Sequence, residues 1–257
     1  MIKPVRDAII PELGMNYWFK KFFKDCVNLV YPISCFSCGI KLNLENNMPI
    51  CMECFQKIKW NAPPYCIRCG KSMSEQRQYR SICAECKSSN FYFVRIWSCC
   101  IYEGIIKDAI LRFKYSENLY LVPFFKEVMA KFIKNNIDKD IADVIIPVPL
   151  FSSRLREKGF NQSKILADIV KEILNKPILL NALKKVKSTK PQQELNRQER
   201  LSNLSGAFSV FNSKEIKNKN ILLIDDVLTT GATLNECARV LKEVLCKEVF
   251  ALTVARG

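Results

Sequence analysis

Residues 221–233 read ILLIDDVLTTGAT and join an apolar run to two adjacent carboxylates, Asp225 and Asp226. The run 220–225 predicts a buried β-strand, and the segment 232–245 has the apolar spacing of an amphipathic helix. A charged pair between a buried strand and the start of a helix needs a chemical reason, because burying charge is costly. This stretch is therefore expected to form a ligand site.

The rest of residues 91–257 alternates in the same way between short apolar runs and amphipathic runs. The expected strands are 94–102, 143–149, 220–225 and 248–255, and the expected helices are 104–114, 120–136, 161–174 and 232–245. Such alternation favours an α/β fold with a parallel sheet. Ligands of such sheets bind at the carboxyl ends of the strands, which is where the acidic pair falls.

The turn after the acidic pair carries groups that suit a phosphate. The start of the next helix offers free backbone N–H groups and a partial positive charge. Thr229, Thr230 and Thr233 add hydroxyl donors, and Gly231 lets the backbone come close to a ligand. Carboxylates cannot bind the phosphate, but they accept hydrogen bonds from a diol. The pattern indicates a ribose 5′-phosphate, since helix capping alone needs only one Asp and one Thr.

Eight of the 13 cysteines form four Cys-x-x-Cys pairs within the first 90 residues. The pairs are Cys35/Cys38, Cys51/Cys54, Cys66/Cys69 and Cys83/Cys86. Each pair has the spacing of a zinc knuckle, and two knuckles make a closed, structural site of four thiolates. We predict two zinc ions, with the first pair joined to the second and the third to the fourth. A cross-braced pairing, first with third and second with fourth, also fits the spacing.

Composition narrows the range of functions. The 257 residues hold 40 Lys and Arg against 25 Asp and Glu, a formal charge of +15, which favours nucleic acid, phosphorylated metabolites or a membrane surface as partner. A solvated basic face explains the charge equally well. The absence of histidine excludes a Ser-His-Asp triad, a Cys-His pair and an H-E-x-x-H metal site.

No segment of 18 uncharged apolar residues is present, so no transmembrane helix is expected, and we expect a cytoplasmic location. Residues 17–30 predict a short amphipathic helix that packs on its own protein or lies on a membrane surface.

At residues 221–233 the chain resembles the type I phosphoribosyltransferases, whose motif for 5-phosphoribosyl 1-diphosphate (PRPP) is an apolar strand, two acids and T-T-G-x-T. Two other segments are similar to the ComF family of competence proteins: IPVPLFSSRLREKGFNQSKILA (146–167) and TKPQQELNRQERLSNLSGAF (189–208). ILRFKY (110–115) and YPISCFSCG (31–39) are similar to shorter elements of that family. The resemblance extends from about residue 18 to the end of the chain.

The resemblance implies three regions. A type I phosphoribosyltransferase-like parallel sheet flanked by helices would occupy residues 91–257. A small double zinc-ribbon module would occupy 35–90, after an N-terminal amphipathic region over 1–34.

The resemblance also implies site residues. Asp225 and Asp226 would bind the ribose hydroxyls and contribute to catalysis. The 5′-phosphate would be held by Thr229, Thr230, Gly231, Ala232 and Thr233, and Val227 and Leu228 would also belong to the PRPP site. Mg²⁺ would arrive on the diphosphate rather than in a cage of protein ligands.

Cations for the diphosphate are implied on two segments. The loop Pro149–Lys158 would present Arg154, Arg156 and Lys158 to it, although Lys158 stands where the family usually has an arginine. That lysine keeps the charge and loses bidentate recognition. A mobile loop over 187–203 would close on the site and add Arg200, which would stabilise the departing diphosphate.

Three functions remain open. The resemblance implies a role in natural transformation, with single-stranded DNA as a ligand and a competence helicase as a candidate partner. A PRPP-dependent transferase for an unidentified base and a non-catalytic PRPP-binding regulator are the alternatives. Aromatic residues in 91–120 would form a hood over the sugar, a stacking surface for bases or simply core. We expect only Tyr115 and one residue of 91–93 to be exposed.

Overall fold

The computed structural model describes residues 34–42, 48–73, 81–88, 90–115, 119–189 and 204–257. The expected amphipathic helix at 17–30 and the expected cation Arg200 lie outside the described residues. Among the described residues, we find no helix with the length and apolar character needed to cross a membrane.

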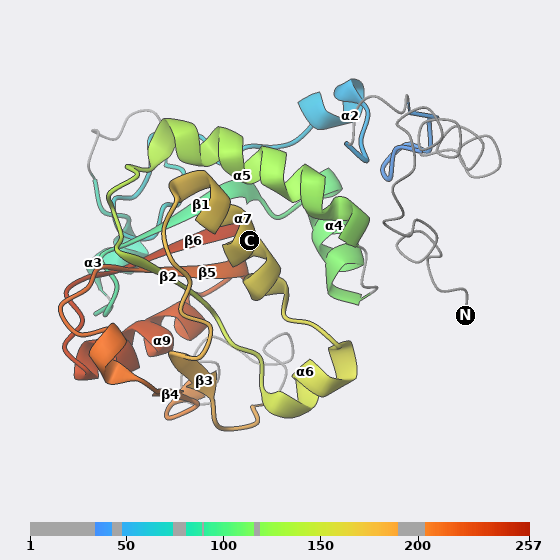
Figure 1. Cartoon of the computed structure of the whole chain (residues 1–257). Helices are drawn as coiled ribbons and strands as arrows, with labels where there is room; N and C mark the ends of the chain where they lie inside the picture. The colour runs from blue at the N-terminus through green and yellow to red at the C-terminus, as the bar shows by residue number, and fades with distance from the viewer. Residues whose placement is uncertain (1–33, 43–47, 74–80, 89, 116–118, 190–203) are drawn as a thin grey trace.

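A four-stranded parallel sheet forms the centre of the molecule (Figure 1). The strands are β1 (Arg95–Ile101), β2 (Val144–Pro147), β5 (Ile221–Leu228) and β6 (Val249–Arg256), in the order β1-β6-β5-β2. Leu223 of β5 pairs with Ala251 of β6 and with Ile146 of β2, so β5 is an inner strand. The predicted α/β class with a parallel sheet is confirmed.

Helices cover both faces of this sheet (Figure 1). One face carries α4 (Gly104–Tyr115), α5 (Val122–Asn136) and α7 (Gln162–Leu174), with the 3-10 turn η1 (Leu119–Leu121) before α5. The other carries α9 (Ala232–Glu243) and the antiparallel pair β3 (Leu183–Lys185) and β4 (Phe208–Val210), which the 3-10 turn η3 (Ser213–Glu215) follows.

The apolar run of β5 explains why both faces are covered. Leu222 and Ile224 enter the core on the α5 side, and Ile221 and Leu223 enter the core on the α9 side. All four side chains are fully buried. A strand buried on both faces reads as a continuous apolar run, because successive side chains point in opposite directions.

The position of the acidic pair differs from the expected one. β5 continues through Leu228, so Asp225 and Asp226 lie within the strand rather than after it. The strand is longer because β6 runs alongside it as far as Arg256, which pairs with Leu228. The pairing of β5 with β2 stops earlier, at Pro147 and Ile224. Asp225 and Asp226 therefore lie in the part of β5 that is paired with β6 but no longer with β2.

The expected loop over residues 149–158 is also different, since it forms the short helix α6 (Ser152–Lys158). Neither glycine nor proline interrupts these seven residues. Gly159 ends the helix in a left-handed conformation, φ 77°, and its N–H donates to the carbonyl of Leu155.

The two cysteine-rich units pack against different elements, the first against α5 and the second beside β1. The first contains α2 (Met52–Gln56), and its Phe36 ring meets Phe124 of α5 at 5.2 Å between centroids. The second contains α3 (Ala84–Lys87). The segment between the units runs beside β1, where the Ile101 N–H donates to the Lys59 carbonyl at 2.9 Å. This segment covers the edge of the sheet at β1.

Candidate functional site

The two aspartates contact different elements. Asp225 Oδ1 accepts a hydrogen bond from the Ser163 hydroxyl, at the start of α7, at 3.0 Å. The backbone N–H of Asp226 donates to the same oxygen at 2.9 Å. Asp226 itself pairs with Lys114 of α4, with 2.9 Å between Nζ and Oδ2. Two helices and the strand therefore orient these carboxylates.

Asp225 has an unusual affinity for protons. Burial is the main cause and the adjacent charge of Asp226 adds to it, and together they raise the pKa of Asp225 to about 7. Burial alone would lower the pKa of Lys114, but the neighbouring Asp226 carboxylate outweighs this effect and raises it. A carboxyl group that changes charge near neutral pH is typical of functional sites.

Further cations surround the acidic pair. Lys158 of α6 lies within electrostatic range of Asp226 and Lys114, and Lys185 of β3 within range of Asp225. Burial lowers the pKa of both lysines, and neighbouring positive charges lower it further. Such a group of cations favours an anionic ligand, because each crowded cation gains from a nearby negative charge.

The three predicted cations before α7 differ in position. Arg154 and Lys158 are four residues apart on α6 and share a face, whereas Arg156 lies between them on the other side of the helix. Arg154 is within electrostatic range of Lys158 and Lys185. Arg156 is exposed.

Sequence reasoning did not identify three polar residues next to the acids: Lys114, Ser163 and Lys185. Lys114 belongs to the ILRFKY segment that resembles a family element, which was the only signal for it. Ser163 resembles an ordinary polar residue of a first helical turn, and the N-cap of α7 is Asn161, whose side chain accepts from the Ser163 N–H at 3.0 Å. Nothing in the sequence around Lys185 distinguishes it from an ordinary surface lysine.

The threonine-rich turn is shorter than predicted, because β5 extends to Leu228 and α9 begins at Ala232. Gly231 precedes α9 in a left-handed conformation, φ 77°, without a side-chain cap on the helix. Thr229 is exposed and Thr230 and Thr233 are half-buried. The side chains of Val227, Leu228 and Ala232 pack into the cores. Only the backbone of these three residues is therefore suited to meet a ligand.

A cavity of about 130 Å³ adjoins this turn. Thr229, Thr230 and Gly231 line one part of it, and Arg256 from the end of β6 also contributes. The remaining lining residues are Cys69, Glu85, Cys86, Phe91, Phe93, Ile96 and Leu228. The cavity thus lies between the threonine turn and the second cysteine-rich unit.

The aromatic residues between 91 and 113 are mostly core, as expected. Phe93, Trp97 and Phe113 are buried, whereas Tyr92 is 47% exposed. Tyr92 confirms the prediction that one residue of 91–93 is exposed. The side chain of Tyr115 is outside the described part of the chain.

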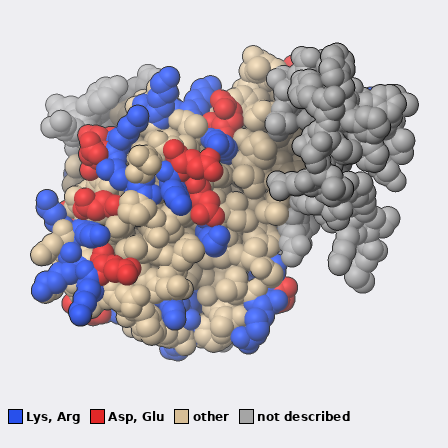
Figure 2. All heavy atoms as spheres, viewed as in Figure 1, with Lys and Arg blue, Asp and Glu red and all other residues tan. Residues whose placement is uncertain are grey.

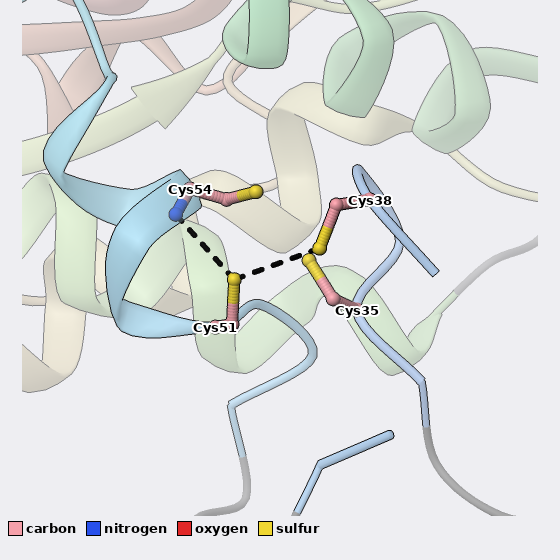
Figure 3. Close-up of side chains that lie close together, drawn as sticks. All are labelled: Cys35, Cys38, Cys51 and Cys54. Atoms are coloured by element: carbon pink, nitrogen blue, oxygen red, sulfur yellow. Dashed lines mark hydrogen bonds between the residues drawn. The ribbon is translucent and has the colours of Figure 1, made fainter. Parts of the chain in front are cut away.

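The cysteine pairs meet in two groups. The first cysteine cluster consists of Cys35, Cys38, Cys51 and Cys54, and the second of Cys66, Cys69, Cys83 and Cys86. In each cluster the four sulfur atoms lie within 4.8 Å of one another. Figure 3 shows the sulfurs of the first cluster turned toward a common centre. The predicted pairing of first with second and third with fourth is confirmed.

The sulfur spacing fits a tetrahedral zinc ion. Zn–S bonds of about 2.3 Å place the sulfurs about 3.8 Å apart in a tetrahedron. The Sγ atoms of Cys38 and Cys51 are 3.7 Å apart, and those of Cys69 and Cys83 are 3.8 Å apart. The donor set and the spacing both suit zinc.

Each cluster already favours one thiolate. Burial opposes ionisation of Cys35, but backbone N–H groups of Cys38 and Cys51 outweigh it and lower the pKa of this thiol to about 6. In the second cluster the Cys83 N–H donates to the Cys66 sulfur at 3.4 Å, and the pKa of Cys66 falls to about 7 against the opposing effect of burial. A bound cation would ionise the remaining thiols.

Two family models match the chain in line with this geometry. The double zinc ribbon domain matches residues 26–88, and the phosphoribosyl transferase domain matches residues 155–257. The fold and the site thus define an α/β protein with a phosphoribosyltransferase-type domain that follows two four-cysteine ribbons.

Similar sequences identify the family within this class of proteins. Competence protein F of Haemophilus influenzae is 30% identical over 231 residues, which are 88% of this chain and 98% of that protein. ComFC of Bacillus subtilis is 29% identical over 210 residues, 78% of this chain and 80% of that protein. The DNA utilization protein YhgH of Salmonella typhimurium is 24% identical over 83% of this chain and 92% of its own length. The chain belongs to the family of competence protein F and ComFC.

Proposed function

We propose that the protein binds PRPP with Mg²⁺ at the carboxyl end of β5, binds single-stranded DNA, and acts in DNA uptake. The observation that carries the first part is the acidic pair of β5 beside the turn at Thr229–Gly231. The acids suit a diol and the turn suits a phosphate, and the two lie on one strand and its following turn. A phosphoribosyl group carries both chemical features.

Each side chain has a stated task in this proposal. Asp225 and Asp226 accept hydrogen bonds from the ribose hydroxyls, and the turn before α9 donates backbone and hydroxyl hydrogens to the 5′-phosphate. Lys158 and Lys185 face the negative charge of the diphosphate. Mg²⁺ bound to that diphosphate would neutralise part of its charge. The predicted cation Arg200 keeps its proposed role on the leaving group.

Calorimetric titration with PRPP and Mg²⁺ tests this site. The double variant Asp225→Asn and Asp226→Asn keeps the shape of both side chains and removes both charges. We expect its affinity to fall by at least about tenfold, as for the loss of charged hydrogen bonds. Asp168→Asn is the matched control, because Asp168 accepts from Lys164 on the surface of α7 at 3.3 Å. Equal affinity in all three proteins would remove the claim.

Turnover is a separate question with its own assay. A transferase would release diphosphate from PRPP in the presence of its acceptor, with help from positioning and from cations on the leaving group. Diphosphate release measured with a panel of nucleobases and with single-stranded DNA tests this. Binding of PRPP without release under any of these conditions would favour a PRPP-binding regulator over an enzyme.

The proposal of DNA binding rests on the names of the relatives and on charge. The relatives are called competence proteins and DNA utilization proteins. The chain carries a formal charge of +15. On the face in Figure 2, however, Lys and Arg are interspersed with Asp and Glu and form no single basic stripe. We propose that DNA binds in the local groove lined by the exposed aromatic Tyr92 together with Arg68 and Lys242.

Binding of oligonucleotides at several salt concentrations tests DNA recognition. The logarithm of affinity should fall linearly with the logarithm of salt concentration if phosphates are contacted. A flat response contradicts a groove that follows the phosphates. A competence helicase remains a predicted partner.

We also propose one structural zinc ion in each cysteine cluster. Elemental analysis should find close to two zinc ions per chain. Cys66→Ser should lower this to about one, because three thiolates leave the second cluster open. A chain that holds no zinc after purification without chelator would contradict the assignment.

A further inference from the structure

Arg256 connects two regions of the molecule. It lies at the end of β6, in register with Leu228 at the end of β5, and is only 9% exposed. Its Nη1 donates to the carbonyl of Cys69 at 2.8 Å and lies 3.9 Å from the sulfur of Cys69. A buried guanidinium from the sheet therefore holds the knuckle turn of the second cysteine cluster.

Arg256 also lines the cavity beside the threonine turn. On one side of that cavity are Thr229, Thr230 and Gly231. On the other are Cys69 and Cys86, two members of the second cysteine cluster, together with Glu85. The turn proposed to hold a phosphate and the cluster proposed to hold zinc thus share one small space, and Arg256 borders both.

We infer that Arg256 is a positioning residue that couples zinc binding at the second cysteine cluster to ligand binding at the Thr229–Gly231 turn. This inference rests on the proposed function. Zinc with four thiolates carries a net charge of about −2, and a ligand phosphate brings further negative charge to the same cavity. Nη1 of Arg256 already holds the Cys69 carbonyl, and a phosphate on the cavity side of the same guanidinium would fix Arg256 in that position. Each negative group therefore orders Arg256 for the other, and a shared cation between them offsets their mutual repulsion. Coupling of this kind is reciprocal: the ligand strengthens zinc retention, and zinc strengthens ligand binding.

A second arginine provides a matched control. Arg95 of β1 lies over the Trp97 ring at 4.9 Å and within electrostatic range of Cys66 and Tyr65. It stands beside the same cysteine cluster and is not among the residues that line the cavity. Its loss should weaken zinc retention without altering the effect of a ligand.

The first cysteine cluster provides an internal control. It packs against α5 through Phe36 and Phe124, and none of its cysteines borders the cavity. Cys38 is exposed, so the first cluster should release zinc at a different rate from the second cluster. A Cys51→Ser variant removes it and identifies which kinetic phase belongs to the second cluster.

The experiment measures zinc release from the full-length protein to a colorimetric chelator, with and without PRPP and Mg²⁺. In the wild type, PRPP should slow release from the second cluster by about fivefold or more, the lower end of typical coupling. Release from the first cluster should not change. Arg256→Gln should release zinc at the same rate with and without PRPP, and Arg256→Lys should restore part of the effect. Arg95→Gln should release zinc faster and keep the full effect.

The outcomes separate this inference from the proposed function. If calorimetry shows that the wild type binds PRPP and zinc release is unchanged by it, the coupling is absent. The same conclusion follows if Arg256→Gln keeps the full effect of PRPP, or if Arg95→Gln removes it as well, since Arg256 would then have only a general structural role. If the wild type does not bind PRPP at all, the proposed function itself is wrong.

Discussion

Replacement of Asp225 by asparagine should stabilise the protein at neutral and alkaline pH while it impairs the proposed ligand site. The carboxylate is largely buried next to Asp226, and burial followed by this neighbouring charge raises the pKa of Asp225 to about 7. Asp225 Oδ1 alone accepts from Ser163 and from the Asp226 N–H. The amide oxygen of asparagine retains both hydrogen bonds, so the substitution removes the charge with little change in packing.

The sign and size of the effect follow from proton linkage. The ordinary pKa of an aspartate is about 4. Between about pH 4 and pH 7, the folded protein therefore holds a proton that the unfolded chain has lost, and stability falls as the pH rises through this window. Each pKa unit corresponds to about 1.4 kcal/mol, and the slope flattens as the pH passes the folded pKa of about 7. The wild type therefore loses about 2 kcal/mol from pH 5 to pH 7 and about 3 kcal/mol by pH 8. The asparagine variant has no such cost.

Urea unfolding monitored by tryptophan fluorescence, at pH 5, 6, 7 and 8 with zinc present, measures this difference. The free energy of unfolding of Asp225→Asn minus that of the wild type should grow by about 3 kcal/mol from pH 5 to pH 8. Ionisation of the cysteines is common to both proteins and cancels in the difference. Asp108→Asn, on the exposed surface of α4, should follow the pH profile of the wild type.

A difference that stays constant over this range would refute the assignment of a buried, charge-destabilised carboxylate. So would a variant whose advantage is greatest at pH 5, because this would mean that the carboxylate is stabilised by its cations. A gain in stability together with weaker PRPP binding would identify Asp225 as a residue retained for function at a cost to the fold.

Two further predictions concern the ion pair of Lys114 with Asp226 and the close contact at Gly70. Lys114→Met should lower the free energy of unfolding by about 2 kcal/mol in urea titrations, because it leaves the Asp226 carboxylate unpaired with only 14% of its side chain exposed. Adding Asp226→Asn should recover most of this loss. A double variant that is no more stable than Lys114→Met would contradict the pairing. Gly70→Ala should lower the free energy of unfolding by at least about 2 kcal/mol more than Gly39→Ala does. Both glycines have positive φ, but only at Gly70 would the new methyl group overlap a neighbouring atom, the carbonyl oxygen of Ile96. Equal thermal or urea stability of the two variants would exclude this clash.

Local patterns were sufficient for much of the fold. The four strands of the parallel sheet and the helices α4, α5, α7 and α9 were predicted from apolar periodicity, with ends that differ by a few residues, as at β5. The short strands β3 and β4 were not predicted. The longer β5 could not be foreseen, because its last residues are polar and its extent is set by pairing with β6 up to Arg256. The helix α6 was missed because a short run of mixed charged residues has no apolar periodicity.

The pairing of the cysteine knuckles shows where spacing stops being informative. Sequential and cross-braced pairings suit the same intervals along the chain. The packing of Phe36 against Phe124 holds the first cluster against α5. The hydrogen bond from the Ile96 N–H to the Arg68 carbonyl, at 2.7 Å, holds the second unit beside β1.

The sequence by itself determined the α/β class, the four knuckles and the acid and threonine motif, because each is encoded by residues that are close together in the chain. Tertiary structure alone brought Lys114 and Lys185 to the acidic pair and placed Arg256 between the threonine turn and the second cysteine cluster. A lysine or arginine has the same local pattern at the surface and in a site. Which role it takes depends on packing between distant segments, and packing also sets the burial that moves the pKa of Asp225.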